Sequence, residues 1–380
     1  MDTPDPSGRT PAGHPSLSGK ALAAAPRAWI GSPEVSLAPG TDTVLLTRML
    51  TFRNFAGLPF VASAPPHACA LIADKALDFV AKQGGLTVWR LADCPPRVIR
   101  LLREREILPQ RALSFPGKKG FKYLAASPGG ESWTLVNEVE HVTCGRIFPG
   151  CAPEASEACF APPAESADRS PWAWSRRFGY LASDPARIGP GFAVEAVAHL
   201  PGLALSRRLL QARNYLTAAG VGFLAATVPS PHAVSPGAAD AGLFRLASRG
   251  GLGRAPREVY QAFLNAIGPV LRREREARER CLENHRKRLE ERTHHSLQRL
   301  IGADSLTYAE LLAAGSLVRL GAALGLANVQ IPGILEELRV TAASGHLAVT
   351  SGRDLSKEEE DFARANVVRL SLRMHSGEIS

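Results

Sequence analysis

The sequence lacks any run of about eighteen apolar residues, so no segment is long enough to cross a membrane as a helix. It also lacks a basic-then-apolar signal near its N-terminus, and we therefore expect a cytoplasmic protein with no membrane partner. Its six cysteines include no Cys-x-x-Cys pair, and no histidine stands at zinc-finger spacing from them. Cys144, Cys151 and Cys159 could in principle bind a metal. The simpler interpretation is that the cysteines are reduced structural thiols, and we predict no metal site.

The sequence also has no block of Arg and Lys interleaved with aromatic residues. The net charge of +9 would suit an anionic partner, but without such a block we predict no nucleic-acid partner. The most charged stretch, Arg272–Arg292, also contains many glutamates. Mixed signs of this kind are typical of an ordinary solvated helix face.

Three regions differ in composition and hydrophobic pattern. Residues 1–40 are rich in Pro, Ala, Ser and Gly, which predicts a disordered tail. Residues 41–255 alternate short strand patterns with a few helices, which predicts an α+β domain. Residues 256–380 have helical spacing throughout and predict an all-α domain that opens with a long helix from Arg257 to about Leu300.

Individual elements follow from the apolar period and from the turn residues. The predicted strands are a run from Thr43, then Leu86–Leu91, Ser132–Glu138, His141–Ile147, Phe192–Leu200, Val221–Val228 and Leu243–Ala247. The predicted helices besides the long one are Leu71–Lys82, Ser206–Ala219, Tyr308–Leu326, Pro332–Ala343 and Ser356–Leu372. The last of these opens with a capping box, in which Ser356 is followed three residues later by Glu359. Residues 150–170 are expected to form a loop.

Two segments resemble the catalytic motifs of the ATP:guanido phosphotransferases. Val136-Asn137-Glu138-Val139-Glu140-His141 is similar to the Asn-Glu-Glu-Asp-His segment of that family. Phe178-Gly179-Tyr180-Leu181-Ala182-Ser183-Asp184-Pro185, followed by Gly189-Pro190-Gly191, is similar to its Tyr-Gly-Tyr-Leu-Thr-Ser-Cys-Pro…Gly-Thr-Gly-Leu-Arg segment. The family contains creatine kinase, arginine kinase and the bacterial protein-arginine kinase.

The C-terminal third resembles the bacterial protein-arginine kinase in particular. Glu274–Glu279, Val318–Gly321 and Glu360–Ala365 are similar to its Glu-Arg-x-Ala-Arg-Glu, Arg-Leu-Gly and Arg-Asp-x-x-Arg-Ala segments. The resemblance implies an antiparallel sheet flanked by helices, followed by a helical domain that supports dimerisation and regulation.

The resemblance also implies a phosphate clamp of five arginines, because the guanidinium fork matches phosphate geometry and stays charged. In this sequence Arg48 matches the first clamp position. The other four positions hold uncharged residues, namely Leu50, Thr143, Ala193 and Leu224. A charge-assisted hydrogen bond contributes roughly 1.5–3 kcal/mol, so four losses remove on the order of 6–12 kcal/mol of potential phosphate binding as an upper bound. We therefore expect ATP binding in the family's manner to fail.

The carboxylates that would orient a guanidinium and accept its proton are also replaced. The family's second Glu is Val139 here. Glu138 and Glu140 flank it and would point to the opposite face if the segment were a strand. The family's Gly-Glu-Gly-Ser-Glu loop falls near Ala238, and the only acid between Glu195 and Glu258 is Asp240.

Of two further residues of the family motifs, a cysteine is replaced here and a histidine is retained. The reactive cysteine of the family is Asp184 here. His141 is retained, but a lone histidine beside a strand is usually a packed structural residue, and that is our expectation.

A second possible site lies near the C-terminus. In the family the Arg-Asp-x-x-Arg-Ala motif lines an allosteric pocket for phosphoarginine. Here Asp361, Arg364 and Ala365 match, but Glu360 replaces the first arginine. A surface ion pair between Asp361 and Arg364 at a helix start is the competing interpretation.

Three hypotheses follow. The first is a catalytically inactive relative, dimeric through its helical domain, that binds no cofactor and acts beside an active arginine kinase, its adaptor or a protease system. The second is an active protein-arginine kinase that uses ATP and Mg²⁺ with relocated residues. Its cations would be Arg48 with Arg146, Arg245 or Arg249, and its acids Glu138, Glu140 or Asp240. The third is a reader of guanidinium or phosphoarginine at Asp361 and Arg364.

Overall fold

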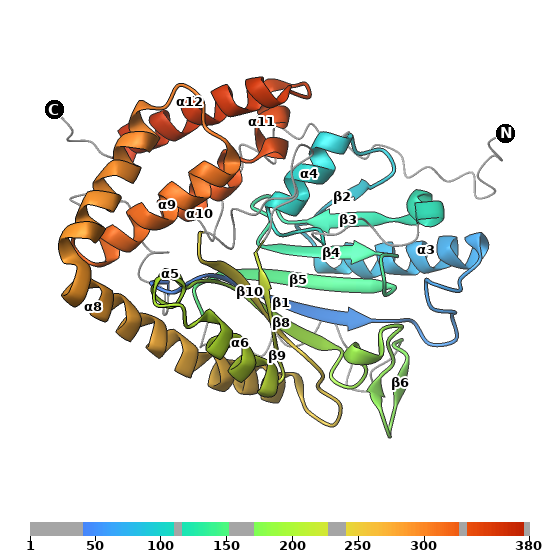
Figure 1. Cartoon of the computed structure of the whole chain (residues 1–380). Coiled ribbons are helices and arrows are strands. Elements are labelled where there is room, and N and C mark those ends of the chain that lie inside the picture. The colour runs from blue at the N-terminus through green and yellow to red at the C-terminus, as the bar shows by residue number, and fades with distance from the viewer. Residues whose placement is uncertain (1–40, 110–115, 152–170, 227–240, 327–332, 376–380) are drawn as a thin grey trace.

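The computed structural model describes residues 41–109, 116–151, 171–226, 241–326 and 333–375. The predicted tail at 1–40 and most of the predicted loop at 150–170 lie outside the described residues. An eight-stranded antiparallel sheet forms the centre of the molecule, with helices packed against it and a helical C-terminal part beside it (Figure 1). The α+β fold predicted from the sequence is confirmed.

The strands lie in the order β2-β3-β4-β5-β1-β8-β10-β9, so the first strand of the chain is in the middle of the sheet. β1 (Val44–Arg53) is buried along its whole length because it pairs with β5 on one side and β8 on the other. The other strands of the sheet are β2 (Thr87–Arg90), β3 (Tyr123–Ala126), β4 (Ser132–Val136), β5 (Val142–Pro149), β8 (Phe192–His199), β9 (Val221–Ala225) and β10 (Leu243–Ser248). A separate hairpin pairs β6 (Trp174–Ser175) with β7 (Gly179–Tyr180).

Successive residues of β1 point to opposite faces of the sheet. The face that carries Met49 packs against α6 (Leu209–Ala218) and the first half of α8 (Pro256–Gly302), while α3 (Pro66–Gln83) covers it nearer β4. The face that carries Leu50 packs against α4 (Pro96–Glu104) and against α11 (Ser344–Ser351). The C-terminal helices therefore reach back onto the sheet.

The C-terminal part is built around the second half of α8. α9 (Tyr308–Ala323) and α12 (Lys357–His375) contact α8, and α10 (Ile334–Thr341) and α11 lie against those helices (Figure 1). The long helix and the capping box are confirmed: the Ser356 N–H donates to Glu359 Oε2 at 2.8 Å, and the Glu359 N–H donates to Ser356 Oγ at 3.2 Å. The division into domains at residues 255 and 256 stays a prediction.

Several of the predicted elements have different bounds in the structure; the helix predicted from Leu71, for instance, begins at Pro66. The strand predicted to reach Glu138 ends at Val136, because Asn137 has a left-handed φ of 56° and turns the chain. The helix predicted from Ser206 begins at Leu209, since Arg207 has a φ of 57°. The helix predicted to reach Ala343 ends at Thr341, and α11 follows it as a separate, unpredicted helix.

Candidate active site

The sheet register brings the five proposed clamp positions onto one face. These positions are Arg48, Leu50, Thr143, Ala193 and Leu224. Arg48 and Leu50 lie two apart in β1, and Leu50 pairs with Ala193. Thr143 pairs with Phe52 of β1, two residues further on. Leu224 pairs with Arg245, which pairs with Val197, and Val197 in turn pairs with Leu46. We call the side of the sheet that carries these five positions the clamp face.

Arg48, the one clamp arginine in place, is bonded to the protein itself. Its side chain donates to Glu195 Oε2 at 2.6 Å and to the backbone oxygen of Glu106 at 2.7 Å. Only 7% of the residue is exposed. Glu195 lies directly opposite Arg48 in the β1–β8 pairing, so the strand register holds the two side chains together.

Two further arginines complete a cluster around Glu106. Arg245 donates to both carboxylate oxygens of Glu106, at 2.8 and 2.7 Å, and to Glu195 at 3.2 Å. Arg339 of α10 donates to Glu106 at 3.2 Å, so the helical C-terminal part contributes a cation to this face. We call the five side chains Arg48, Glu106, Glu195, Arg245 and Arg339 the ion cluster. It holds three positive and two negative groups, and both carboxylates face two or more guanidiniums.

The acids of the ion cluster are strongly held in their charged form. Burial works to raise the pKa of Glu106, but the surrounding guanidiniums outweigh it and lower the pKa to about 2. The pKa of Glu195 is lowered by the same balance. Glu106 was not identified from the sequence, and neither was Arg339, because no pattern connects residues so far apart in the chain.

The four substituted clamp positions contribute no cation. Leu50 and Thr143 are buried, Ala193 is half-buried, and Leu224 is 61% exposed. Leu50 packs into the apolar cluster under α4. The aliphatic side chains offer a phosphate no hydrogen bond, and the Thr143 hydroxyl carries no charge, so these positions do not reproduce a clamp of guanidiniums.

The segment with the retained carboxylates is a tight connection and not a strand. Residues 137–141 join β4 to β5, so the expected argument from strand alternation does not apply. Glu140 is fully buried and accepts hydrogen bonds from Asn54 Nδ2 at 2.7 Å and from the Ser183 N–H at 2.9 Å. Glu138 is buried as well, whereas Val139 is half-buried and its carbonyl accepts from Ser183 Oγ at 2.8 Å. Glu140 thereby ties this connection to the second family motif.

His141 is a packed structural residue, as expected. Its Nδ1 accepts from the Phe55 N–H at 2.9 Å, and its Nε2 lies 2.9 Å from the Pro59 oxygen. Because Nδ1 accepts, Nε2 must carry the proton, and the ring is neutral. Burial lowers the pKa of His141, which agrees with that assignment.

Asp184, which replaces the family's cysteine, caps a short 3-10 helix, η3 (Pro185–Arg187). Its Oδ1 accepts from the Ala186 N–H at 3.0 Å, and Arg187 lies 3.4 Å from its other oxygen. A carboxylate in this position has no nucleophilic thiol to offer.

The second candidate site is closed. The Arg364 guanidinium donates to the backbone oxygens of Ala342 at 2.9 Å and Leu306 at 2.8 Å, and it also donates to Asp361. Glu360 lies 3.6 Å from its remaining nitrogen. Arg364 is 1% exposed, so the expectation of a surface ion pair is wrong: the pair forms, but it is buried between α12 and its neighbours.

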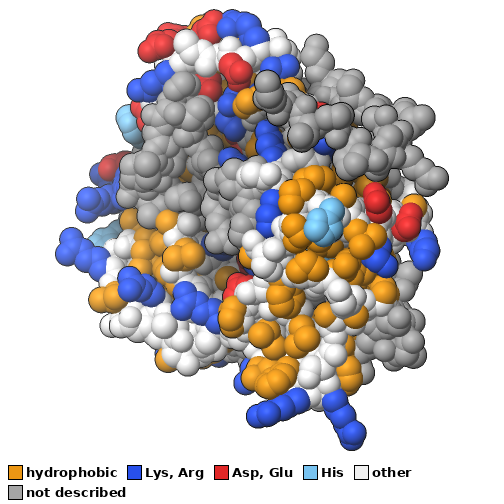
Figure 2. Space-filling view, turned by 90° about the vertical axis from the view of Figure 1, so that its right-hand side faces the viewer, with side chains coloured by type: hydrophobic (Ala, Val, Ile, Leu, Met, Phe, Trp, Pro, Cys, Tyr) orange, Lys and Arg blue, Asp and Glu red, His pale blue; other side chains and the backbone are white. Residues whose placement is uncertain are grey.

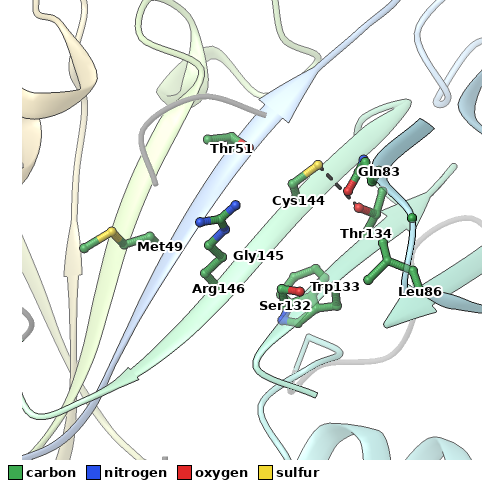
Figure 3. A pocket seen from close by; sticks show the side chains of 11 residues that line it. Met49, Thr51, Gln83, Leu86, Ser132, Trp133, Thr134, Cys144, Gly145 and Arg146 are labelled. Atoms are coloured by element: carbon green, nitrogen blue, oxygen red, sulfur yellow. Dashed lines mark hydrogen bonds between the residues drawn. The ribbon is translucent and has the colours of Figure 1, made fainter. Parts of the chain in front are cut away.

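Of the residues considered for a relocated active site, Arg48 and Arg245 come together in the ion cluster, whereas Arg146 does not. Arg245 belongs to the ion cluster, while Arg146 pairs with Met49 and therefore lies on the other face of the sheet. There it lines a cavity of about 140 Å³ with Cys144 and Thr134, whose hydroxyl donates to the Cys144 sulfur at 3.5 Å (Figure 3). Arg249 is exposed beyond the end of β10. Asp240 and Ala238 lie outside the described residues.

A nucleotide and its magnesium ion do not fit the clamp face as the described residues arrange it. In the described ranges no three His, Cys, Asp or Glu side chains group in a way that could hold a metal ion. Arg48 and Arg245, two cations of the clamp face, are bonded to carboxylates that would repel a phosphate.

The fold is that of the phosphagen kinases, a class of phosphotransferases. The duplicated taurocyamine kinase from Schistosoma mansoni, solved with transition-state analogue components, is similar with a TM-score of 0.51 and 14% identity. The match covers 63% of this chain and 34% of that one.

Sequence comparison identifies the family within this class. The C-terminal domain of protein-arginine kinase McsB matches residues 286–379. The protein-arginine kinase of an Exiguobacterium species is 30% identical over 239 residues, covering 63% of this chain and 67% of the relative. That of Bacillus subtilis is 26% identical over 345 residues, covering 88% and 92%. This chain belongs to the protein-arginine kinase family, as its motifs predict. None of its described helices is long and apolar enough to span a membrane.

Proposed function

We propose that this chain is a catalytically inactive member of the protein-arginine kinase family that works as a binding or regulatory protein. The observation that carries the proposal is the state of Arg48. To hold a phosphate, Arg48 would have to exchange the Glu195 carboxylate at 2.6 Å for the ligand. The exchange would also leave a carboxylate of the ion cluster facing the phosphate, which costs free energy.

The energetic balance supports the proposal. Four clamp positions without a cation remove on the order of 6–12 kcal/mol of potential phosphate binding. The whole binding free energy of a micromolar ligand is about 8 kcal/mol. Even when the lost terms are discounted for non-additivity, too little remains to bind a nucleotide on the clamp face.

The catalytic base is missing as well. Val139 can neither accept a proton nor pair with a guanidinium. Its neighbour Glu140 is occupied by Asn54 and by backbone N–H groups of the second motif. Moving Glu140 toward a substrate would leave these buried donors without an acceptor, a cost of about 1–3 kcal/mol for each.

A binding role requires a surface that another protein can contact. We propose that the helical C-terminal part forms a homodimer, and that the partner is an active arginine kinase, its adaptor or a protease system. Hydrophobic side chains also gather on the side of the molecule where α3 and the β6–β7 hairpin lie (Figure 2). Leu71, Trp174 and Phe178 there are 46%, 39% and 42% exposed. Exposed apolar side chains in one region are typical of protein contacts.

The test is a phosphoryl-transfer assay with the full chain, radiolabelled ATP, Mg²⁺ and an arginine-rich protein. The Bacillus subtilis protein-arginine kinase is the positive control. We expect no acid-labile phosphoarginine above a heat-inactivated sample. Sustained phosphoarginine formation that Arg48→Ala abolishes would defeat the proposal.

The second candidate function is an active protein-arginine kinase with ATP and Mg²⁺. It is favoured by the relatives, which are named protein-arginine kinases, and by Arg249. Arg249 is exposed, and its guanidinium lies beside Gly222 of β9, at the edge of the clamp face. Transfer activity that is lost in Arg249→Ala but kept in Arg146→Ala would establish this function.

A further inference from the structure

A second cavity, of about 480 Å³, lies between α8 and the turn that follows α5 (Pro201–Leu205). Five arginines line it: Arg207 and Arg208 from the turn, and Arg280, Arg288 and Arg292 from α8. No acidic residue is among its lining residues, all of which are described. We call this cavity the α8 pocket.

Among the described residues, four of these arginines have no charged partner. Arg280 lies 3.8 Å from Glu276, which is a weak, exposed pair. Within the described part of the chain, no hydrogen bond or ion pair engages the side chains of the other four, Arg207, Arg208, Arg288 and Arg292. Like charges gathered in one concave site raise the local potential and attract anions.

The periodicity of α8 explains why the carboxylates of this segment do not neutralise the pocket. Before the bend at His285, the pocket is lined by Ala277, Arg280, Cys281 and Asn284, which recur every three or four residues and share one helix face. Glu276, Glu279 and Glu283 do not line it, and Glu279 falls on the opposite side of the helix. The glutamates of this segment therefore stay outside the pocket, and Glu276 flanks it through its weak pair with Arg280.

The walls of the pocket are held in place by buried contacts. Glu274 of α8 accepts from the N–H groups of Gly202 and Leu203 in α5, both at 2.8 Å, and from Arg278 at 2.6 Å. The turn after α5 is closed by Ser206 Oγ, which donates to the Gly202 oxygen at 2.7 Å. The arginine side chains thus project from two elements that are fixed to each other. Ligand binding therefore loses less conformational entropy than it would if these elements moved independently.

The bend in α8 brings the last two arginines into the pocket. His285 has φ −140° and ψ 26°, outside the helical range, and it lines the pocket itself. Arg288 and Arg292 follow it on the same side. The match to the family's C-terminal domain begins at residue 286, so the pocket bridges that domain and the helix that packs on the sheet.

We propose that the α8 pocket binds a small polyphosphate anion, meaning a chain of linked phosphates. Four unpaired guanidiniums are matched by a ligand with about four negative charges, which an inorganic triphosphate or a nucleoside triphosphate carries and a single phosphate does not. The volume admits such a chain, and the Asn284 side chain adds an amide N–H to the lining. The site is separate from the clamp face, and it requires no phosphoryl transfer.

The test is calorimetric titration of the full chain with inorganic triphosphate at low ionic strength, followed by ATP in a second arm. We expect saturable binding that weakens at least about tenfold in Arg288→Gln/Arg292→Gln, because each exposed guanidinium lost reduces the affinity by a few-fold. Asn284→Asp places a carboxylate in the lining and is expected to weaken binding to a similar extent. Equal affinity for triphosphate and ATP would mean that the pocket recognises the phosphate chain alone. Tighter binding of ATP would mean that it recognises a nucleotide.

The matched control is Arg272→Gln/Arg286→Gln, which removes the same charge from exposed positions of α8 outside the pocket. It is expected to bind within about twofold of the parent chain. An equal loss in this control would overturn the proposal, since binding would then follow net charge alone. The proposal would also be overturned if binding of triphosphate did not saturate. The same holds if a single-stranded oligonucleotide or a poly-glutamate peptide bound at least about tenfold more tightly than triphosphate.

Alkylation of Cys281 reports contact at the pocket itself. The bound anion should slow this reaction in the parent chain and not in Asn284→Asp.

Discussion

Arginines gather in two regions of this molecule, and they differ in what they are bonded to. On the clamp face, Arg48, Arg245 and Arg339 enclose two carboxylates and are largely buried. In the α8 pocket, four arginines are exposed and have no partner in the described chain. The family relationship leads one to expect an anion at the clamp face, whereas our proposal places one in the α8 pocket.

The difference shows that an anion site is defined by the pairing of its cations and not by their number. A guanidinium already bonded to a carboxylate must give up that bond before it can hold a phosphate. An exposed guanidinium gives up only water. The ion cluster is part of the folded structure, in which Arg339 joins the C-terminal helices to Glu106.

The largest effect is expected when the ion cluster loses its central acid. Glu106→Gln leaves Arg48, Arg245 and Arg339 with one carboxylate, Glu195, and should lower the free energy of unfolding by about 3–5 kcal/mol. Urea denaturation measures it. Glu276→Gln is the matched control, since its exposed pair with Arg280 should contribute less than about 0.5 kcal/mol. A loss below about 1 kcal/mol in Glu106→Gln would show that the cluster is not structural.

The next largest effect concerns how the free energy of unfolding depends on pH, to which the buried acids Glu104 and Glu106 contribute with opposite sign. Burial raises the pKa of Glu104 to about 7, although the N–H groups of Gly345 and His346 donate to it. Its ordinary pKa is 4.5, so between about pH 4.5 and 7 the folded chain keeps a proton that the unfolded chain has lost. The stability contributed by Glu104 therefore falls as pH rises through this window, by about 3 kcal/mol.

Glu106 titrates with the opposite sign. Its folded pKa of about 2 lies below its ordinary value of 4.5, so its contribution is present above about pH 4.5 and is lost as the pH falls toward 2. Unfolding free energies measured across pH for the parent chain and Glu104→Gln separate the two. The variant should have a flatter profile between about pH 4.5 and 7, and an unchanged slope there would contradict the assignment to Glu104.

A smaller effect tests whether the connection between β4 and β5, residues 137–141, contributes to stability. Ser183→Ala removes the hydrogen bond from Ser183 Oγ to the Val139 oxygen and should lower the unfolding free energy by about 1 kcal/mol. Ser63→Ala removes an exposed bond of the same kind, at 3.2 Å to the Phe60 oxygen, and should cost less. Equal effects in a chemical denaturation experiment would argue against a special role for this connection.

The smallest effect on stability is expected when arginines of the α8 pocket, and not of the ion cluster, are replaced. Arg288→Gln/Arg292→Gln removes unpaired, exposed guanidiniums and should change the unfolding free energy by no more than about 0.5 kcal/mol. Thermal denaturation in the absence of any phosphate is the measurement. A marked destabilisation would mean that these arginines bond to the protein after all, and that the two regions are alike.

Much of the fold was predictable because it follows from local periodicity and from motifs. The long helix, the capping box at Ser356 and the central strands have clear patterns, and the clamp register predicted from the family resemblance places all five positions on one face. α11 was missed because its Ser-Gly-His opening is a poor helix signal. Gly345 is needed there for close packing: a Cβ would come within 2.5 Å of the Leu101 nitrogen.

The sequence was less informative about the partners of charged residues. It allowed us to predict which clamp positions lack an arginine, since that prediction depends on single positions. It could not show that Arg48 is held by Glu195 and Glu106, because that depends on strand register and on a turn with a φ of 62° at Glu106. The α8 pocket was hidden for a similar reason: which charged side chains of this segment line it depends on the helix face and on the bend at His285.

The most direct measurement is phosphoarginine formation by the full chain on an arginine-rich protein, with Mg·ATP in excess and the Bacillus subtilis enzyme run in parallel. Transfer and not binding is the readout, because a nucleotide held in the α8 pocket would register in any binding assay. We expect no more product than in a heat-inactivated sample. Turnover that continues beyond one product per chain and disappears in Arg48→Ala would contradict this expectation.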